Sequence, residues 1–174
     1  MNETLKTLTG RASCRKFKPE HISKEELDQI LAAGLAAPSG MNLQPQVLVA
    51  VQNDELVKKL SAMNAAVMGK TDLDPFYGAK DVVIVLVKQT PTCVEDGALA
   101  LGNMLNAAAS LGLGACWVHR AKEMFASADG KALLKEWGLD EDMIGVGCCI
   151  LGYPDTALTV KERKEGRVVY VGAV

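Results

Sequence analysis

Two arginines and a serine alternate near the N-terminus, as Arg11, Ser13 and Arg15. In an extended chain alternate side chains share a face, so these three would project together while Cys14 points to the opposite face. Two guanidinium forks beside a hydroxyl suit an anion, because Arg binds phosphate oxygens bidentately. A solvated basic surface is the alternative, since Lys16 follows directly. The strip therefore predicts an anion site or an exposed charged face.

A second polar stretch, residues 35–46, reads LAAPSGMNLQPQ. Pro38 cannot continue a helix, and Gly40 tolerates a positive φ, so the stretch predicts a shaped turn between a helix and a strand. Its polar side chains are those of Ser39, Asn42 and Gln44. Loops of this kind between rigid elements are where ligands usually bind. An ordinary helix-to-strand connection remains the other interpretation.

The surrounding elements follow from capping and hydrophobic patterns. The capping box from Ser23 to Glu26 predicts a helix that begins at Ser23 and turns Leu27, Ile30, Leu31 and Leu35 inward. Further helices are expected over 4–9, 54–63, 94–111 and 131–137, buried strands over 46–52, 81–88, 115–118 and 146–151, and an edge strand over 167–171. Residues 64–80 form either a lid, with Phe76 and Tyr77 over a flat ligand, or a connection with small core contacts.

This order of helices and buried strands predicts one α+β domain over residues 1–174. It would be an α/β/α three-layer sandwich around a mixed central sheet. The long helix over 94–111 is rich in Gly and Ala, and Gly102 lies in its middle. A mid-helix Gly costs about 1 kcal/mol against Ala, so we expect another backbone to approach it closely, within the subunit or across a dimer.

Composition excludes several classes of function. A formal net charge of -2 argues against a nucleic-acid surface, and no apolar run is long enough for a membrane span. Five cysteines without regular spacing predict reduced thiols and a cytoplasmic location. With two histidines and no clustered Cys/His set, no metal site is expected. The chain also lacks a G-x-G-x-x-G turn or a Walker loop, which disfavours a Rossmann dinucleotide site.

The two polar stretches, in this order and spacing, resemble the nitroreductase family of flavin enzymes. The family's Arg-x-Ser-x-Arg/Lys element matches Arg11, Ser13 and Arg15, and its Pro-Ser-x-x-Asn-x-Gln-Pro loop matches residues 38–45. Residues 111–120, LGLGACWVHR, and 152–163, with Gly-Tyr-Pro and Lys-Glu-Arg, extend the resemblance over the whole chain. The chain departs from the family at Gln46, often aromatic in relatives, and in the shortness of residues 63–81.

The resemblance implies noncovalent FMN at the interface of a homodimer, with NADH or NADPH as electron donor. Arg11, Lys161 and Arg163 would hold the phosphate, Ala12 and Ser13 would lie beside it, and Arg15 would face the N1/C2 edge of the ring. Pro38, Ser39, Gly40 and Asn42 would reach the ring from the partner subunit, and Gln44 the ribityl chain. Trp117, Val118, His119 and Arg120 would lie alongside the isoalloxazine.

The implied activity is ping-pong reduction of a flat small-molecule electron acceptor, such as a nitroaromatic or a quinone. The flavin carries the hydride, so no catalytic side chain is required. His119 could donate a proton to the acceptor or be a structural group. Reductive dehalogenation, flavin breakdown and non-catalytic flavin binding are alternatives on the same fold. No membrane or nucleic-acid partner is implied.

Overall fold

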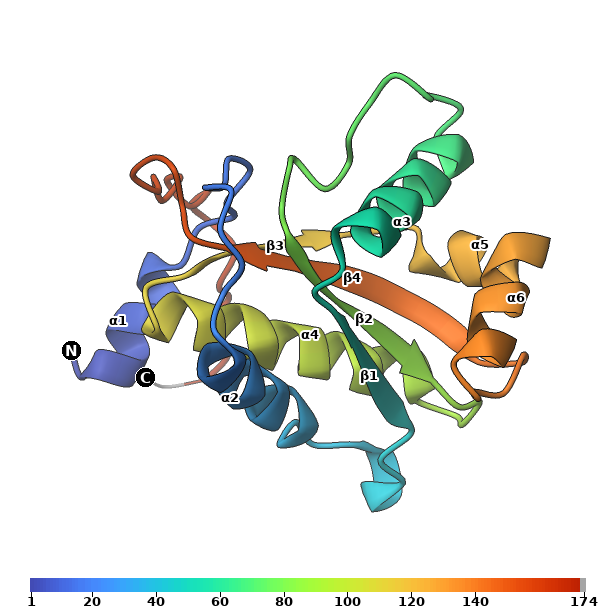
Figure 1. Ribbon diagram of the computed structural model, residues 1–174. Coiled ribbons are helices and arrows are strands. Elements are labelled where there is room, and N and C mark those ends of the chain that lie inside the picture. The colour runs from blue at the N-terminus through green and yellow to red at the C-terminus, as the bar shows by residue number, and fades with distance from the viewer. Residues whose placement is uncertain (173–174) are drawn as a thin grey trace.

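The structure is a computed structural model that describes residues 1–172 of the 174-residue chain. Helices and strands alternate along most of it (Figure 1). In chain order they are α1 (Glu3–Gly10), α2 (Lys24–Leu35), the 3₁₀ turn η1 (Gly40–Asn42), β1 (Gln46–Val51), α3 (Asp54–Val67), β2 (Asp81–Val87), α4 (Cys93–Ser110), β3 (Gly114–Val118), α5 (Ala121–Ala126), α6 (Ala128–Glu136) and β4 (Ile144–Gly152).

The four strands form one sheet in the order β1-β2-β4-β3, and every neighbouring pair is antiparallel. The expectation of a mixed sheet is therefore corrected: the parallel pairing in residues 1–172 is an isolated bridge between Ser13 and Ala115. The reason is that α3 and residues 68–80, which connect β1 to β2, begin and end at the same end of the sheet, so β2 runs back along β1. Val51, where β1 ends, pairs with Val82 near the start of β2.

Two helical layers cover the sheet, as Figure 1 shows, and β2 supplies side chains to both. Ile84 faces the core formed with α3, α5 and α6, whereas Val83 and Val85 face the core formed with α2 and α4. This division follows from the period of two along a strand. β2 is buried along its whole length, and after Asp81 its residues form an unbroken apolar run in the sequence. The predicted α+β three-layer architecture is confirmed.

Helix α2 begins as the capping box predicts. Ser23 Oγ accepts a hydrogen bond from the backbone N–H of Glu26 (3.1 Å), and Glu26 Oε2 accepts one from the Ser23 N–H (2.8 Å). Leu27 and Ile30 are buried, but Leu35 is 56% exposed, so its predicted inward position is wrong. Its place in the last turn explains this, because the helix ends at that residue.

The longest helix, α4, lies against the sheet opposite α3. No part of residues 1–172 contacts the position of a Cβ on Gly102, so the expected close approach is not made within the described subunit. Gly97 instead is the crowded glycine, since a Cβ there would meet Val146 and Val87. No helix in the described residues has the length and apolar character needed to cross a membrane.

The predicted edge strand over residues 167–171 is wrong, because these residues are irregular. The sheet edge beside β3 is already occupied by the N-terminal strip, where the Cys14 N–H donates to the Ala115 carbonyl (2.9 Å). Val168, Val169, Tyr170 and Val171 are 69 to 92% exposed. An apolar run of this kind resembles a strand in the sequence but has no partner strand in the described chain.

Candidate functional site

The strip from Arg11 to Arg15 runs extended beside the start of β3. Cys14 is buried, whereas Ser13 and Arg15 are exposed, which is the alternation that the sequence predicts. Burial raises the pKa of the Cys14 thiol, and its Sγ lies 3.1 Å from the Lys16 carbonyl. The predicted structural role of Cys14 is consistent with this burial, and the strip presents its cationic face outward.

A cavity of about 190 Å³ joins this strip to the C-terminal segment. It is lined by Arg11, Ala12, Ser13, Arg15, Thr159, Lys161 and Arg163. These residues come from opposite ends of the chain, so the fold brings together the two cationic motifs that the sequence separates. We call this space the cationic cavity. Throughout residues 1–172 none of its four Arg and Lys side chains forms an ion pair with a carboxylate.

A second space, of about 220 Å³, begins where the first ends, because Arg15 lines both. Its other walls are residues 116–120, at the end of β3, and the side chains of Met68, Leu73, Pro75 and Tyr77. The Arg15 guanidinium lies 6.0 Å from the centre of the Tyr77 ring, at the limit of a cation–π contact. We call this space the aromatic pocket. Trp117, Val118, His119 and Arg120 therefore share a site with Arg15.

Residues 64–80 divide between the two roles that the sequence left open. Phe76 is fully buried in the core, whereas Tyr77 is 42% exposed and faces the aromatic pocket. Asp74 holds the segment by accepting hydrogen bonds from Ser61 Oγ (2.5 Å) and from the N–H groups of Phe76 (2.9 Å) and Gly78 (2.6 Å). The segment is thus a fixed wall of the pocket built on α3.

Sequence reasoning missed Asn64, a fully buried residue of α3. Its Nδ2 donates to the His119 carbonyl (2.7 Å), and its Oδ1 accepts from Arg120 Nε (3.1 Å). The signal was a polar residue on the inward face of a helix, because a buried amide requires hydrogen-bond partners. Asn64 therefore connects α3 to the wall of the aromatic pocket that follows β3.

The loop with Pro38, Ser39, Gly40, Asn42 and Gln44 is not brought to either cavity. Gln46, where β1 begins, pairs with Val87 at one end of the sheet, whereas Ala115, beside the strip, pairs with Leu151 at the other. In Figure 1 the loop accordingly projects from the far end of β1, away from the N-terminal strip.

The loop is nevertheless ordered by its own hydrogen bonds. Ser39 Oγ accepts from the Gln44 N–H (3.0 Å), and Asp96 Oδ1 accepts from the Gly40 N–H (2.9 Å). Positive φ angles fall on Met41, Asn42 and Gln44 rather than on Gly40. Gly40 is required instead because a Cβ there would collide with Thr92. Strain at three non-glycine residues in one short loop is typical of functional segments.

Comparison with known proteins gives the family. The model of the nitroreductase family matches residues 8–163. An NADPH-flavin oxidoreductase from Vibrio harveyi is 30% identical, over 97% of this chain and 73% of its own. A nitroreductase with bound FMN from Bacteroides fragilis superposes with a TM-score of 0.90 at 29% identity, covering 99% of this chain and 100% of its own. A nitroreductase with bound FMN from Desulfitobacterium hafniense superposes with a TM-score of 0.89 at 29% identity, covering 99% of this chain and 100% of its own. The chain belongs to the nitroreductase family.

Proposed function

We propose that the chain is an FMN-dependent oxidoreductase that uses NADH or NADPH to reduce flat electron acceptors such as nitroaromatics or quinones, and that residues 1–174 form its single FMN-binding domain. The observation that carries this proposal is the cationic cavity: Arg11, Arg15, Lys161 and Arg163 converge without acidic partners in the described residues. Unpaired cations around one small space are suited to a dianionic phosphate. The FMN-bound relatives support the same conclusion.

The residues that line the two adjoining cavities fit the two ends of FMN. The cationic cavity would take the phosphate, with Arg11, Lys161 and Arg163 as charged donors and Ser13 as a hydroxyl donor. The aromatic pocket would take the ring, between Trp117 on one wall and Tyr77 on another. Arg15, which lines both, would face the polar edge of the ring. When bound, FMN supplies the hydride transfer, and the protein supplies position and electrostatics.

His119 is the side chain placed to move a proton in this site. It is exposed and lines the aromatic pocket, while its backbone carbonyl is held by Asn64. No hydrogen bond to its imidazole is formed within residues 1–172. An imidazole without a structural hydrogen bond can donate a proton to the electron acceptor. Of the two roles considered for His119, proton donor or structural group, we therefore propose proton donation.

We further propose that the active form is a homodimer, because the loop that the family resemblance assigns to the flavin ring lies far from both cavities of its own chain. The loop over residues 38–44 carries exposed apolar side chains, Met41 at 77% and Leu43 at 46%, in an ordered conformation far from both cavities. Such a surface is suited to burial against a second subunit. The exposed apolar run over residues 168–171 fits the same assembly. Five free and buried cysteines fit a reducing, cytoplasmic compartment.

The absorption spectrum of purified protein, before and after anaerobic addition of NADH or NADPH, tests the cofactor and the donor. We expect one FMN per chain, bleaching with the donor, and return of colour when a nitroaromatic or quinone is added. Initial-rate plots should be parallel, since donor and acceptor use one pocket in turn. Recovery of FAD, absence of flavin after reconstitution, or a flavin that neither donor bleaches would refute the proposal.

Subunit mixing tests the shared site. Arg11→Ala alters the cationic cavity of one chain, and Asn42→Ala alters the loop that would serve the other. Each variant alone should lose most activity, whereas dissociated and reassociated mixtures should recover about a quarter of wild-type activity, because half the dimers then hold one intact site. A control mixture of Arg11→Ala with Arg163→Ala should recover no activity, because both residues line the cavity of one chain and every cavity in the mixture is then altered. No recovery with Asn42→Ala, or a monomer that retains FMN, would refute the shared site.

A further inference from the structure

Arg120 adopts a backbone conformation that few arginines adopt. Its φ and ψ are 78° and 8°, in the left-handed region that favours glycine. Such a conformation costs free energy and persists where the surrounding structure enforces it, often at a functional site. Asn64 supplies part of that enforcement through its bond to Arg120 Nε and to the preceding carbonyl. The side chain of Arg120 is therefore held in place from within the core.

The guanidinium has binding capacity that the protein does not use. Among residues 1–172 its one hydrogen bond is the Nε contact with Asn64, and it forms no ion pair. A guanidinium has five N–H donors, so the two terminal nitrogens are available to a ligand. Arg120 is also partly exposed and lines the aromatic pocket. Its terminal nitrogens thus offer a fork suited to a carboxylate.

Arg120 lines the aromatic pocket alone, whereas Arg15 lines both spaces. The walls of the aromatic pocket also include the apolar side chains of Met68, Leu73 and Pro75. An apolar wall with one fixed cation is suited to a flat aromatic ring that carries an anionic group.

We propose that Arg120 determines specificity for aromatic acceptors that bear a carboxylate or a similar anionic group, and that Asn64 is the positioning residue that holds it. The proposal rests on the proposed reductase function and goes beyond it, because it names the charge of the acceptor. The flavin phosphate and ring edge are already served by Arg11, Arg15, Lys161 and Arg163. Arg120 is the cation left for the acceptor.

The test compares two acceptors that differ chiefly in charge, 4-nitrobenzoate and 4-nitrobenzamide. The ratio of their kcat/KM values, benzoate over benzamide, should fall at least about tenfold in Arg120→Gln, since a charge-assisted bond contributes about 1.5 kcal/mol or more. The loss should appear mainly in KM for the benzoate and should exceed any change for the benzamide. Arg120→Lys should retain part of the preference. Arg167→Gln, an exposed arginine outside both cavities, is the matched control and should keep the wild-type ratio.

The positioning role of Asn64 has its own variant. Asn64→Leu removes both hydrogen bonds and should lower the benzoate preference in the same direction as Arg120→Gln. Because Asn64 is fully buried, this variant could fold poorly, so Asn64→Ala, which removes the same two hydrogen bonds without adding a branched side chain, is made beside it. The preference should fall in whichever of the two variants folds. A preference that survives in folded Asn64→Leu would refute the positioning role.

Binding without turnover gives an independent measurement. Benzoate and benzamide are titrated into FMN-loaded wild type and Arg120→Gln, and binding is followed by calorimetry or by the flavin spectrum. Benzoate affinity should fall in Arg120→Gln by a larger factor than benzamide affinity. If the ratio of benzoate to benzamide, in kcat/KM and in affinity, is the same in wild type and Arg120→Gln, the inference is overturned. Bleaching of the flavin by NAD(P)H would then still support the proposed reductase function. A flavin that is not bleached refutes the reductase, and the binding titration then still decides the inference. Equal slowing of both acceptors with a lowered reduction potential would place Arg120 on the flavin instead and overturn it.

Discussion

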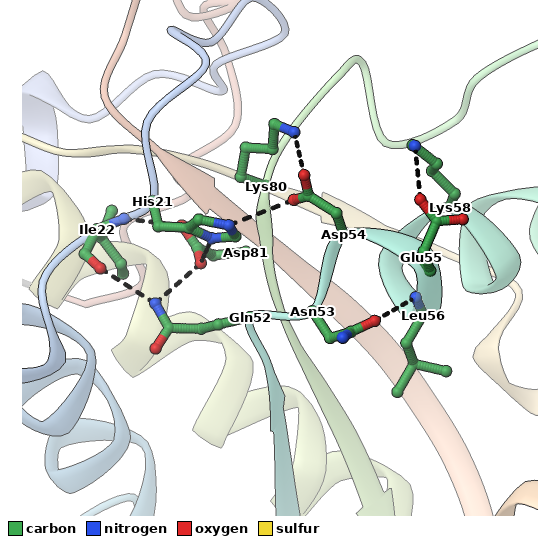
Figure 2. Close-up of polar contacts among 10 residues, drawn as sticks. All are labelled: His21, Ile22, Gln52, Asn53, Asp54, Glu55, Leu56, Lys58, Lys80 and Asp81. Atoms are coloured by element: carbon green, nitrogen blue, oxygen red, sulfur yellow. Dashed lines mark hydrogen bonds and ion pairs between the residues drawn. The ribbon is translucent and has the colours of Figure 1, made fainter.

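Two charged regions of this protein lie at the same end of the sheet and are built in opposite ways. The first, shown in Figure 2, joins His21, Gln52, Asp54, Lys80 and Asp81. The carboxylate of Asp81 is buried and accepts hydrogen bonds from His21 Nδ1 (2.8 Å), the Ile22 N–H (2.9 Å) and Gln52 Nε2 (2.9 Å). In this network the carboxylate is satisfied by donors from three neighbouring residues.

Asp54 completes the network at its exposed end. Its Oδ2 accepts from Lys80 Nζ (2.7 Å), and its Oδ1 lies 3.2 Å from His21 Nε2, at ion-pair distance without hydrogen-bond geometry. The hydrogen bond from Lys80, with the neighbouring charges of Lys80 and His21, lowers the pKa of Asp54. A cavity of about 430 Å³ borders Asp54, Lys58 and Lys80, yet both lysines are paired with carboxylates.

The cationic cavity and the aromatic pocket show the reverse arrangement. Arg11, Arg15, Arg120, Lys161 and Arg163 have no carboxylate partner in the part of the chain that the structure describes. Crowded like charges are unfavourable unless an anion joins them. The comparison separates charges that are satisfied within the fold from cations that have no partner in it, and the second set is where we propose that ligands bind. The volume of a cavity alone does not separate the two.

The largest expected effect is on stability, from Asp81→Asn. The amide would place an N–H against other donors, so buried hydrogen bonds would be lost and the free energy of unfolding should fall by about 3 kcal/mol. Urea unfolding of the FMN-free protein measures it. Asp28→Asn, which breaks only an exposed pair with Lys24, is the control and should leave the midpoint unchanged. An unchanged midpoint for Asp81→Asn would remove the distinction drawn between the two regions.

Arg11→Ala should have the opposite profile. The affinity for FMN should fall by about ten- to a hundredfold in both redox states, because the phosphate keeps its charge throughout. The stability of the FMN-free protein should stay the same or rise, since one crowded cation is removed. Fluorescence titration with FMN and urea unfolding measure the two quantities. Arg167→Ala is the control, and a loss of stability like that of Asp81→Asn would show that Arg11 is structural.

The sequence predicts the groups that interact with their neighbours in the chain. The capping box at Ser23, the buried run of β2 and the alternation from Arg11 to Arg15 are local patterns, and the structure agrees with each. That Arg11 and Arg163 line one cavity could be predicted only from the family resemblance, because no local sequence pattern shows which distant segments lie together. Asn64 and the irregular C-terminal residues were misread for the same reason: their roles depend on which surfaces the fold leaves available.

The next effect sharpens the comparison within the cationic region itself. In the proposed site Arg15 would face the ring end of FMN, where charge appears only on reduction, and only such a differential interaction moves a reduction potential. Arg15→Ala should lower the reduction potential of bound FMN by about 30 to 65 mV, the equivalent of about 1.5 to 3 kcal/mol for a two-electron couple. Arg15→Lys should lose less. Potentiometric titration decides it: a shift in Arg11→Ala as large as that in Arg15→Ala would mean that Arg15 lies at the wrong end of the cofactor.

The smallest effect concerns a paired carboxylate close to the surface. The Ser23 N–H bonds to Glu26, and the Tyr153 hydroxyl donates to the same Oε2 (2.8 Å), so the pKa of Glu26 is lowered from its ordinary 4.5. A lowered pKa in the folded state gives stability that is present above the ordinary value and is lost as the pH falls through the folded value. Wild type should therefore be more stable than Glu26→Gln at pH 7, and the difference should shrink as the pH falls below about 4.5.

Urea midpoints across a pH series, for wild type and Glu26→Gln, measure this convergence. Glu25→Gln is the matched control, because the Glu25 carboxylate in the same turn accepts no hydrogen bond within residues 1–172. Tyr153 lies just after β4, at the start of the segment that carries Lys161 and Arg163. Its hydrogen bond to Glu26 therefore connects α2 to the segment that lines the cationic cavity. FMN affinity at pH 7 should nevertheless be the same in both proteins, since the cavity's own charges are unchanged. A constant stability difference from pH 7 to pH 3 would show that the Glu26 carboxylate is not stabilised by these bonds.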